Sequence, residues 1–355
     1  MRIALAIALA LLALAPLAMP QPVEPAAFVP KPHPLGYVCP KADTAPTIDG
    51  KLDDGAWKAA PWSEDFVDIE GDKKPKPHHR TRMKMLWDDK AIYIAAELDE
   101  PDVWATLTGH DDIIFMDPDF EVFLDPDGDN HLYGELELNA RNTTWDLLLT
   151  TPYRDGGKAI NGWEIAGLKT AVHIDGTLNN PKDKDRGWTL EIAWPWASLK
   201  ELSNAAVPPK DGDRYRINFS RVQWDTAVKD GTTAKVKDKP ERNWVWSPQG
   251  VIDMHRPERW GYVQFSTKPA GTAKFVPDAD AAVKDWLHDF YYAQQEYRKK
   301  SGKYAATTAD LGEKLAAKTP WGEPTIETSA RGFTVTAGEK KRRWSIAQDS
   351  HLTKE

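Results

Sequence analysis

The sequence has little of several features that would assign it at once to a class of protein. It contains a single cysteine, Cys39, so an intramolecular disulfide is excluded. Its net charge of −8 at pH 7 argues against a nucleic-acid partner. It lacks the H-E-x-x-H, G-x-S-x-G and P-loop motifs. Stability must therefore come from core burial, and any site must be sought outside these motifs.

Long apolar runs are also scarce, and the clearest one lies at the N-terminus. Residues 1–18 combine Arg2, an apolar run and small residues near Ala18, the layout of a secretory signal peptide. The run is too short for a comfortable membrane span. Residues 19–43 are rich in proline and predict an extended, uncovered stalk. We therefore expect a secreted or periplasmic protein with no membrane span in the mature chain.

What the sequence does have is a long region of strand-like alternation. Between residues 44 and 266, short runs with a period of two are separated by turn residues. In GWTLEIAW, for example, Trp188, Leu190, Ile192 and Trp194 share one face of a strand. Long helices are not indicated between these runs. The pattern predicts a mainly β fold, a two-sheet antiparallel β-sandwich of jelly-roll or immunoglobulin-like type.

The composition changes after residue 266. Residues 267–277 read as a linker, and residues 278–355 predict a small α+β module. Val283, Trp286, Leu287 and Phe290 fall at helical spacing, and Gly302 is placed to end the helix. A second short helix and two or three strands are expected to follow. This module is a candidate docking site for a protein partner.

An acidic stretch, Asp125-Pro126-Asp127-Gly128-Asp129, allows two interpretations. An EF-hand loop starting at Asp125 would need glycine at its sixth place and glutamate at its twelfth, where Asn130 and Leu136 stand. The three aspartates at alternate positions could still bind calcium with the help of main-chain carbonyls. The other interpretation is a polar hairpin turn, with Pro126 and Gly128 supplying the backbone angles.

The strands on either side of this turn carry glutamates on one face. Phe120, Val122 and Leu124 alternate with Glu121, and Leu136 and Leu138 alternate with the acids of the next strand. Keeping the leucines inside places Glu121 opposite or diagonal to an acid of that strand. The predicted polar face consists of Glu121, Tyr133, Glu135, Glu137 and Asn139. Such a face is either solvated or binds a ligand rich in hydrogen-bond donors, such as a sugar.

Four ordered motifs within residues 44–266 give the chain a resemblance to a known family. TIDGKLDDGAW, MKMLWDDKAIYIAAELDEP, DFEVFLDPDGD and GWTLEIAWPWASL resemble the carbohydrate-binding module family 9 group, which has a DOMON-like β-sandwich. The resemblance implies a concave sugar site, bound calcium and an association with secreted enzymes, such as xylanases, that degrade plant or microbial polysaccharides.

The resemblance also marks individual positions. Glu121 matches the binding glutamate of the family, and Asn139 falls near its polar ligands. The two stacking tryptophans of xylanase-borne members correspond here to Phe115 and Met254. Trp244, Trp246 and Trp260 lie close by in the sequence and are either substitute stacking residues or core.

Three functions remain open on this basis. The first is a non-catalytic module that binds a saccharide through its polar face and aromatic rings. The second is a glycoside hydrolase, because side chains of cross-strand glutamates lie about 5 Å apart, as the carboxyl groups of retaining glycosidases do. The third is an interaction or assembly module in which the C-terminal part binds a partner.

Overall fold

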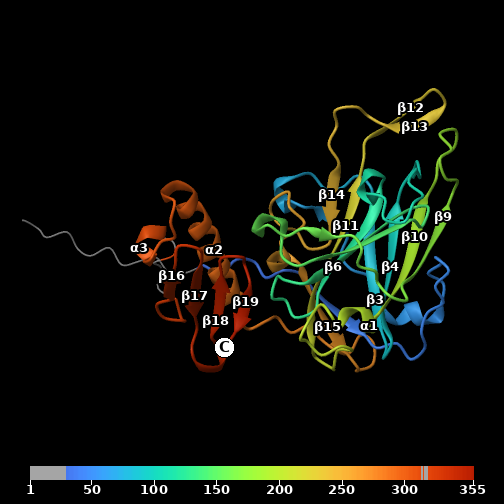
Figure 1. Cartoon of the computed structure of the whole chain (residues 1–355). Coiled ribbons are helices and arrows are strands. Elements are labelled where there is room, and N and C mark those ends of the chain that lie inside the picture. Colours follow the sequence, from blue (N-terminus) through green and yellow to red (C-terminus); the bar gives the residue numbers. More distant parts are fainter. Residues whose placement is uncertain (1–28, 313–314, 316–318) are drawn as a thin grey trace, which may run out of the picture.

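The computed structural model describes residues 29–312, 315 and 319–355. The predicted signal peptide, residues 1–18, and the first part of the predicted stalk lie outside the described residues. Figure 1 shows a large β-rich part and, beside it, a smaller C-terminal part that contains the longest helix. Within the described ranges, no helix combines the length and the apolar character needed to span a bilayer.

The large part consists of two facing sheets. The first has nine strands, in the order β1-β15-β11-β5-β6-β7-β8, with β14 paired to β11 and β2 paired to β14. Its strands are β1 (Gly36–Pro40), β2 (Val67–Asp68), β5 (Asp119–Asp125), β6 (Tyr133–Asn139), β7 (Thr144–Leu149), β8 (Ala159–Ile160), β11 (Arg214–Gln223), β14 (Arg242–Val245) and β15 (Gly261–Ser266). The second sheet has the order β3-β4-β10-β9, formed by β3 (Thr81–Trp87), β4 (Ala91–Asp99), β10 (Gly187–Pro195) and β9 (Lys169–Asp175).

Short elements connect these strands. A two-stranded ribbon, β12 (Thr226–Lys229) with β13 (Thr232–Lys235), projects away from the sheets in Figure 1. The single-turn helix α1 (Trp196–Leu199) follows β10. The 3-10 turns are η1 (Gly55–Ala59), η2 (Gly71–Lys73), η3 (Ile114–Met116), η4 (Tyr153–Asp155), η5 (Pro257–Arg259) and, in the C-terminal part, η6 (Lys340–Arg342).

The core lies between the two sheets and follows from the alternation of the strands. Trp188, Leu190, Ile192 and Trp194 of β10 face Phe120, Val122 and Leu124 of β5 within one buried cluster. Burying each such side chain contributes roughly 1.5–3 kcal/mol to folding. In both sheets the strand pairs are antiparallel, except that β1 runs parallel to β15. The predicted two-sheet sandwich is thus confirmed.

The predicted stalk ends earlier than residue 43. Gly36–Pro40 forms strand β1, which pairs with β15 at the edge of the nine-stranded sheet. Tyr37 and Cys39 alternate into the core, where they are 5% and 0% exposed. The prolines before Gly36 had suggested a longer uncovered segment. The correction follows from the apolar alternation of Tyr37 and Cys39, which gives the segment one face to bury.

The C-terminal part is the predicted small α+β module. Helix α2 (Ala281–Ser301) ends at Gly302, whose φ of 75° is the left-handed conformation that favours glycine. The short helix α3 (Thr308–Leu311) follows. The buried face of α2, with Trp286, Leu287 and Phe290, packs on a four-stranded sheet. That sheet consists of β16 (Thr325–Thr328), β17 (Phe333–Ala337), β18 (Trp344–Ala347) and β19 (Leu352–Lys354).

The two parts are joined by hydrogen bonds as well as by the chain. The main-chain amide of Leu352 donates to the carbonyl oxygen of Asp129 at 3.0 Å. Tyr291 on α2 donates to a carboxylate oxygen of Asp155 at 2.5 Å. The acidic turn between β5 and β6 therefore lies against the C-terminal module.

Candidate functional site

The register of the nine-stranded sheet brings three glutamates together. Glu121 on β5 pairs directly with Glu137 on β6, and Phe123 pairs with Glu135. Glu137 in turn pairs with Trp145 on β7. Directly paired residues of antiparallel strands point to the same side of a sheet. The predicted separation of the glutamates from the leucine face is confirmed, and Glu121 lies opposite Glu137.

This side of the sheet is covered by loops and is not solvated. An apolar cluster outside the main core consists of Ile69, Ile114, Phe123, Tyr133, Trp145, Leu147, Leu149, Val245, Met254 and Trp260. Ile114 and Met254 come from loops folded over the strands. Under this cover Glu121, Glu135 and Glu137 are only 5%, 4% and 2% exposed. The alternative of a solvated polar sheet face is therefore wrong.

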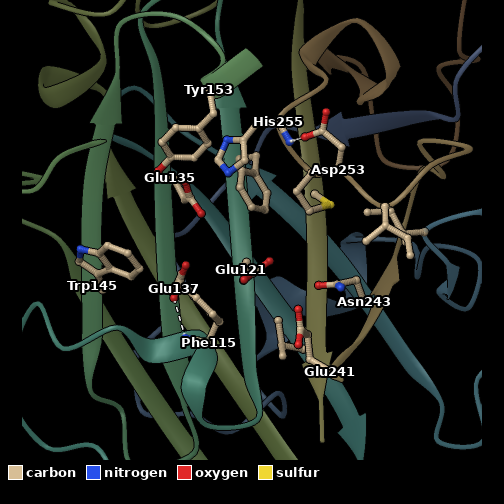
Figure 2. Close-up of a pocket in the computed structure, with 15 residues that line it drawn as sticks. Phe115, Glu121, Glu135, Glu137, Trp145, Tyr153, Glu241, Asn243, Asp253 and His255 are labelled. Carbon is tan, nitrogen blue, oxygen red and sulfur yellow. Dashed lines mark hydrogen bonds between the residues drawn. The ribbon is translucent and has the colours of Figure 1, made fainter. Parts of the chain in front are cut away.

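A pocket of about 270 Å³ opens onto the three glutamates. In Figure 2, Trp145 and Tyr153 lie on one side of the glutamates, and Asn243 and Glu241 lie on the other. The lining residues are Ile69, Phe115, Glu121, Phe123, Glu135, Glu137, Trp145, Tyr153, Val222, Glu241, Asn243, Ile252, Asp253, Met254 and His255. The site thus combines carboxyl groups on rigid strands with aromatic rings and loop residues.

Burial dominates the electrostatics of the carboxyl groups. It raises the pKa of Glu121 to about 7, with a contact to Ser220 acting against this rise and the charge of Glu241 adding to it. Burial and then the charge of Glu121 raise the pKa of Glu135 well above its ordinary value. The same two causes raise the pKa of Glu137. These groups therefore hold protons more strongly than solvated glutamates do, so they can donate as well as accept hydrogen bonds.

The polar atoms of the pocket are only partly used by the protein. The main-chain amide of Phe115 donates to Glu137 Oε2 at 2.9 Å, as Figure 2 shows. Within the described part of the chain, Glu135 Oε2 and Trp145 Nε1 are buried and have no hydrogen-bond partner. Buried polar atoms are rarely left unpaired. The arrangement is suited to a ligand that both accepts and donates hydrogen bonds.

Comparison with known proteins shows the family of the sandwich. Residues 48–266 match the family described as "Carbohydrate family 9 binding domain-like". The chain belongs to this family. The match covers every strand of the two sheets except β1, and every residue that lines the pocket. Among curated proteins, none matches the sequence.

Solved structures also resemble this family 9 domain at low sequence identity. A family 9 carbohydrate-binding module from Caldicellulosiruptor kristjanssonii, in complex with cellotriose, is 15% identical with a TM-score of 0.43. The likeness covers 68% of this chain and all of that chain. A structure described as a candidate carbohydrate-binding protein from Bacteroides uniformis is 16% identical with a TM-score of 0.49, covering 66% of this chain and all of that chain.

Several predicted ligand-binding residues lie at or next to the pocket of the family 9 domain. Glu121, Glu135, Glu137 and Phe115 line it, as does Met254. Tyr133 lies behind the lining, where its hydroxyl is 3.0 Å from Nδ1 of His255. The structure brings these residues together from two strands and two loops.

Asn139 has a different position from the one expected. It is fully buried, and its amide nitrogen donates to Leu107 O and to Asp117 Oδ2, both at 3.0 Å. Its side-chain oxygen accepts from the amides of Arg141 and Thr143. Asn139 therefore holds the loop before η3 against the β6–β7 turn, and it does not line the pocket.

The three tryptophans considered for stacking are buried elsewhere. Trp244 and Trp246 belong to the core between the sheets and are 2% and 1% exposed. Trp260 is fully buried beneath the loop cluster. None of the three lines the pocket. The prediction that Trp244 and Trp246 stack on a ligand needs correction, because their rings already fill the core.

Sequence reasoning missed several lining residues of the family 9 domain. Trp145 could have been found from the sequence. It lies on the strand that follows the one carrying Glu135 and Glu137, and the alternation of side chains along that strand places it on the same side of the sheet. Tyr153, Glu241 and Asn243 lie at turns or at the start of short β14. Asp253 and His255 come from an irregular loop, where no periodic pattern exists to place them.

The acidic turn lies apart from the pocket. Asp125 accepts hydrogen bonds from the amides of Gly128 at 2.9 Å and Asn130 at 3.0 Å. Asp129 accepts from the amide of His131 and lies 3.1 Å from Nε2 of His351. One oxygen from each of Asp125, Asp127 and Asp129 lies within 4.8 Å of the others. The turn interpretation accounts for the amide contacts, and the predicted calcium ion stays a prediction.

Proposed function

We propose that the family 9 domain of this chain binds a saccharide in the pocket around Glu121, Glu135 and Glu137, without cleaving it. The observation that carries the proposal is the buried group of carboxyls on paired strands, bordered by aromatic rings, in a domain of a carbohydrate-binding family. Its location on rigid strands favours binding, because little conformational entropy is lost when the ligand enters.

The chemistry of the lining suits a sugar ring. Sugar hydroxyls donate and accept hydrogen bonds, and the carboxyls with raised pKa values together with Asn243 offer both roles. Phe115 and Trp145 present rings whose centroids lie 6.5 Å apart at an angle of 31°. Such rings can stack on the apolar face of a pyranose. Phe115 therefore keeps the stacking role predicted for it, and Trp145 takes the role that Trp244 and Trp246 do not fill.

Export and a place in polysaccharide breakdown belong to the same proposal. The N-terminal pattern of Arg2 followed by an apolar run supports passage through a secretory route. A saccharide-binding domain outside the cytoplasm would bring its chain to a polymer such as xylan. A docking role for residues 278–355 also stays a prediction, since the contacts described for this module are with its own sandwich.

Calorimetric titration with xylo- and gluco-oligosaccharides tests the proposal. Glu121→Ala should lower the affinity by about tenfold to more than a hundredfold, because it removes a charge-assisted hydrogen bond worth roughly 1.5–3 kcal/mol. Glu164→Ala is the matched control, since that glutamate is 60% exposed and lies outside the pocket. Equal affinities in wild type and Glu121→Ala would contradict the assignment of the site.

Glycoside hydrolysis is the second candidate, and one observation favours it. Glu121 and Glu137 are directly paired, and burial raises the pKa of both, as a general acid requires. A retaining hydrolase also needs a carboxylate that stays ionised, yet the pKa of Glu135 is raised as well. A reducing-sugar assay decides between the two functions. Steady release of reducing ends that disappears in Glu121→Ala would establish hydrolysis.

A further inference from the structure

The pocket has an excess of carboxyl groups without a matching positive charge. Five acids line it: Glu121, Glu135, Glu137, Glu241 and Asp253. Asp253 is paired with Arg256 at 3.1 Å. In the part of the chain that the structure describes, the four glutamates take part in no ion pair. No lysine or arginine lines the pocket.

A further acid lies directly behind this lining. Asp119 is fully buried, and one of its oxygens accepts from the amide of Val222 at 3.2 Å. Its other oxygen, Oδ2, has no hydrogen-bond partner among the described residues. Asp119, Glu121 and Glu137 each contribute an oxygen to a group whose members lie within 4.8 Å of one another. Several buried carboxyls at this separation favour either a bound proton or a bound cation.

Lys235 acts on these acids from outside the pocket lining, since burial lowers its pKa while the charges of Asp117, Glu241 and Asp119 act to raise it. The nearby Lys235 places its Nζ 3.5 Å from the centroid of the Trp224 ring, and this atom has no hydrogen-bond partner among the described residues. Burial lowers the pKa of His255, the only histidine of the lining, to about 4. His255 is therefore neutral near pH 7. Among the described residues Lys235 makes no hydrogen bond to these acids, so a cation that hydrogen-bonds to them would come with the ligand.

The walls of the pocket favour an organic cation over a bare metal ion. Phe115, Trp145 and Tyr153 offer ring faces, which attract cations but are not ligands for calcium. One oxygen of Glu137 and one of Asp119 already accept main-chain amides. Calcium prefers about 6–8 oxygen ligands, more than these acids leave available. A volume of about 270 Å³ also far exceeds the space of a single ion.

We propose that the saccharide bound in this pocket carries a primary ammonium group, as an amino sugar does, and that Glu121 and Glu137, backed by Asp119, accept its hydrogen bonds. Acceptors held about 2.8 Å from one tetrahedral ammonium nitrogen lie roughly 4.6 Å apart. The three oxygens lie within 4.8 Å of one another, which is close enough for a single ammonium nitrogen to reach them. The inference rests on the proposed saccharide site and names the class of sugar that it selects.

Three oligosaccharides of equal length test this selection by calorimetric titration of the full chain at pH 7. They are a glucosamine oligomer, its N-acetylated counterpart and a cello-oligosaccharide. The first carries the ammonium groups, the second replaces them with neutral amides, and the third replaces them with hydroxyls. We expect the glucosamine oligomer to bind at least about tenfold more tightly than either neutral oligomer.

Glu121→Gln should reduce this preference, because the amide keeps the shape of the side chain and removes its charge. Glu164→Gln, at an exposed glutamate outside the pocket, should leave the preference unchanged. Each titration is repeated with a chelator. The comparison of the three ligands on wild type remains decisive if Glu121→Gln does not fold.

Each contrary outcome has a separate meaning. Equal or tighter binding of a neutral oligomer would overturn the amino-sugar inference and leave the saccharide site standing. Absence of binding by all three oligomers would overturn the amino-sugar inference, and if xylo-oligosaccharides also fail to bind, the saccharide site is overturned as well. Binding that the chelator abolishes in Asp127→Asn as well as in wild type would place a metal ion among Asp119, Glu121 and Glu137, apart from the acidic turn, and would also overturn the inference.

Discussion

The side-chain amide of Asn130 donates a hydrogen bond of 2.8 Å to the main-chain carbonyl oxygen of Ser350. The same amide nitrogen lies 2.9 Å from Nε2 of His288. Nδ1 of His288 lies 2.8 Å from the carbonyl oxygen of Lys284, which can only accept, so Nε2 is the acceptor for Asn130. A residue of the acidic turn thus joins the sandwich to both α2 and the segment before β19. The turn serves as a contact between the two parts of the chain.

Replacing Asn130 by glycine should weaken this contact. Asn130 has a φ of 75°, which glycine adopts without strain, so the variant removes the amide without straining the turn. The change leaves the oxygen of Ser350 and Nε2 of His288 without their partner in a buried place. We expect a loss of about 1–3 kcal/mol in the free energy of unfolding, measured by urea titration. An unchanged unfolding midpoint would show that the contact contributes nothing to stability.

The sequence predicts the sandwich and the side of the sheet that carries the glutamates. Both follow from the period of two, since alternation around Glu121 and Glu135 leaves only one register that buries the leucines. The same reasoning extends to Trp145, which pairs with Glu137 across the next strand. The alternation of side chains between the two faces of a strand is a local property of the sequence, and it can be recognised before any contact is known.

The burial of the glutamates could not be read in the same way. Whether a sheet face is solvated depends on loops distant in sequence, and the loops that bring Phe115 and Met254 over the strands have no periodic pattern. The positions of Trp244 and Trp246 could not be predicted either. An aromatic residue on a strand suits a core and a binding surface equally well. These features are set by long-range packing.

The raised pKa of Glu121 gives stability a measurable pH dependence. The folded chain holds this proton up to about pH 7, whereas the ordinary pKa is 4.5. The stability from this group is therefore fully present below about pH 4.5 and is lost as the pH rises through about 7. Glu121→Gln does not titrate, so its stability relative to wild type should increase from pH 5 to pH 8, by at most about 3 kcal/mol.

Urea titrations of both proteins across this range measure the difference. Buried histidines such as His255 and His288 titrate in both proteins and cancel in the comparison, whereas Glu135 and Glu137, whose pKa the charge of Glu121 helps to raise, contribute to the difference. A stability difference that stays constant from pH 5 to pH 8 would contradict the burial of an ionisable Glu121.

The predicted calcium site at the acidic turn can be tested by thermal unfolding. An ion that binds only the folded chain raises its stability with concentration, by about 2.7 kcal/mol at a hundred times the dissociation constant. Calcium should therefore raise the melting temperature of wild type, and a chelator should lower it. Asp127→Asn removes an exposed acid of the turn and should reduce the response. A melting temperature that changes with neither calcium nor chelator would rule out the site.

Two tryptophans should respond differently to substitution if the pocket binds a saccharide. Trp145 lines the pocket and is 9% exposed. Trp145→Ala should lower saccharide affinity by at least about fivefold, because a stacking contact is worth roughly 0.5–1.5 kcal/mol beyond the area that it buries. The change should be seen in calorimetric titration against the tightest-binding oligosaccharide.

Trp244→Phe is the matched change in the core. Trp244 is 2% exposed and packs between the sheets, so the smaller ring should leave a cavity and lower the free energy of unfolding by about 1 kcal/mol or more. Its saccharide affinity should equal that of wild type, because the ring does not reach the pocket. An affinity loss in Trp244→Phe with none in Trp145→Ala would place the stacking surface elsewhere on the domain.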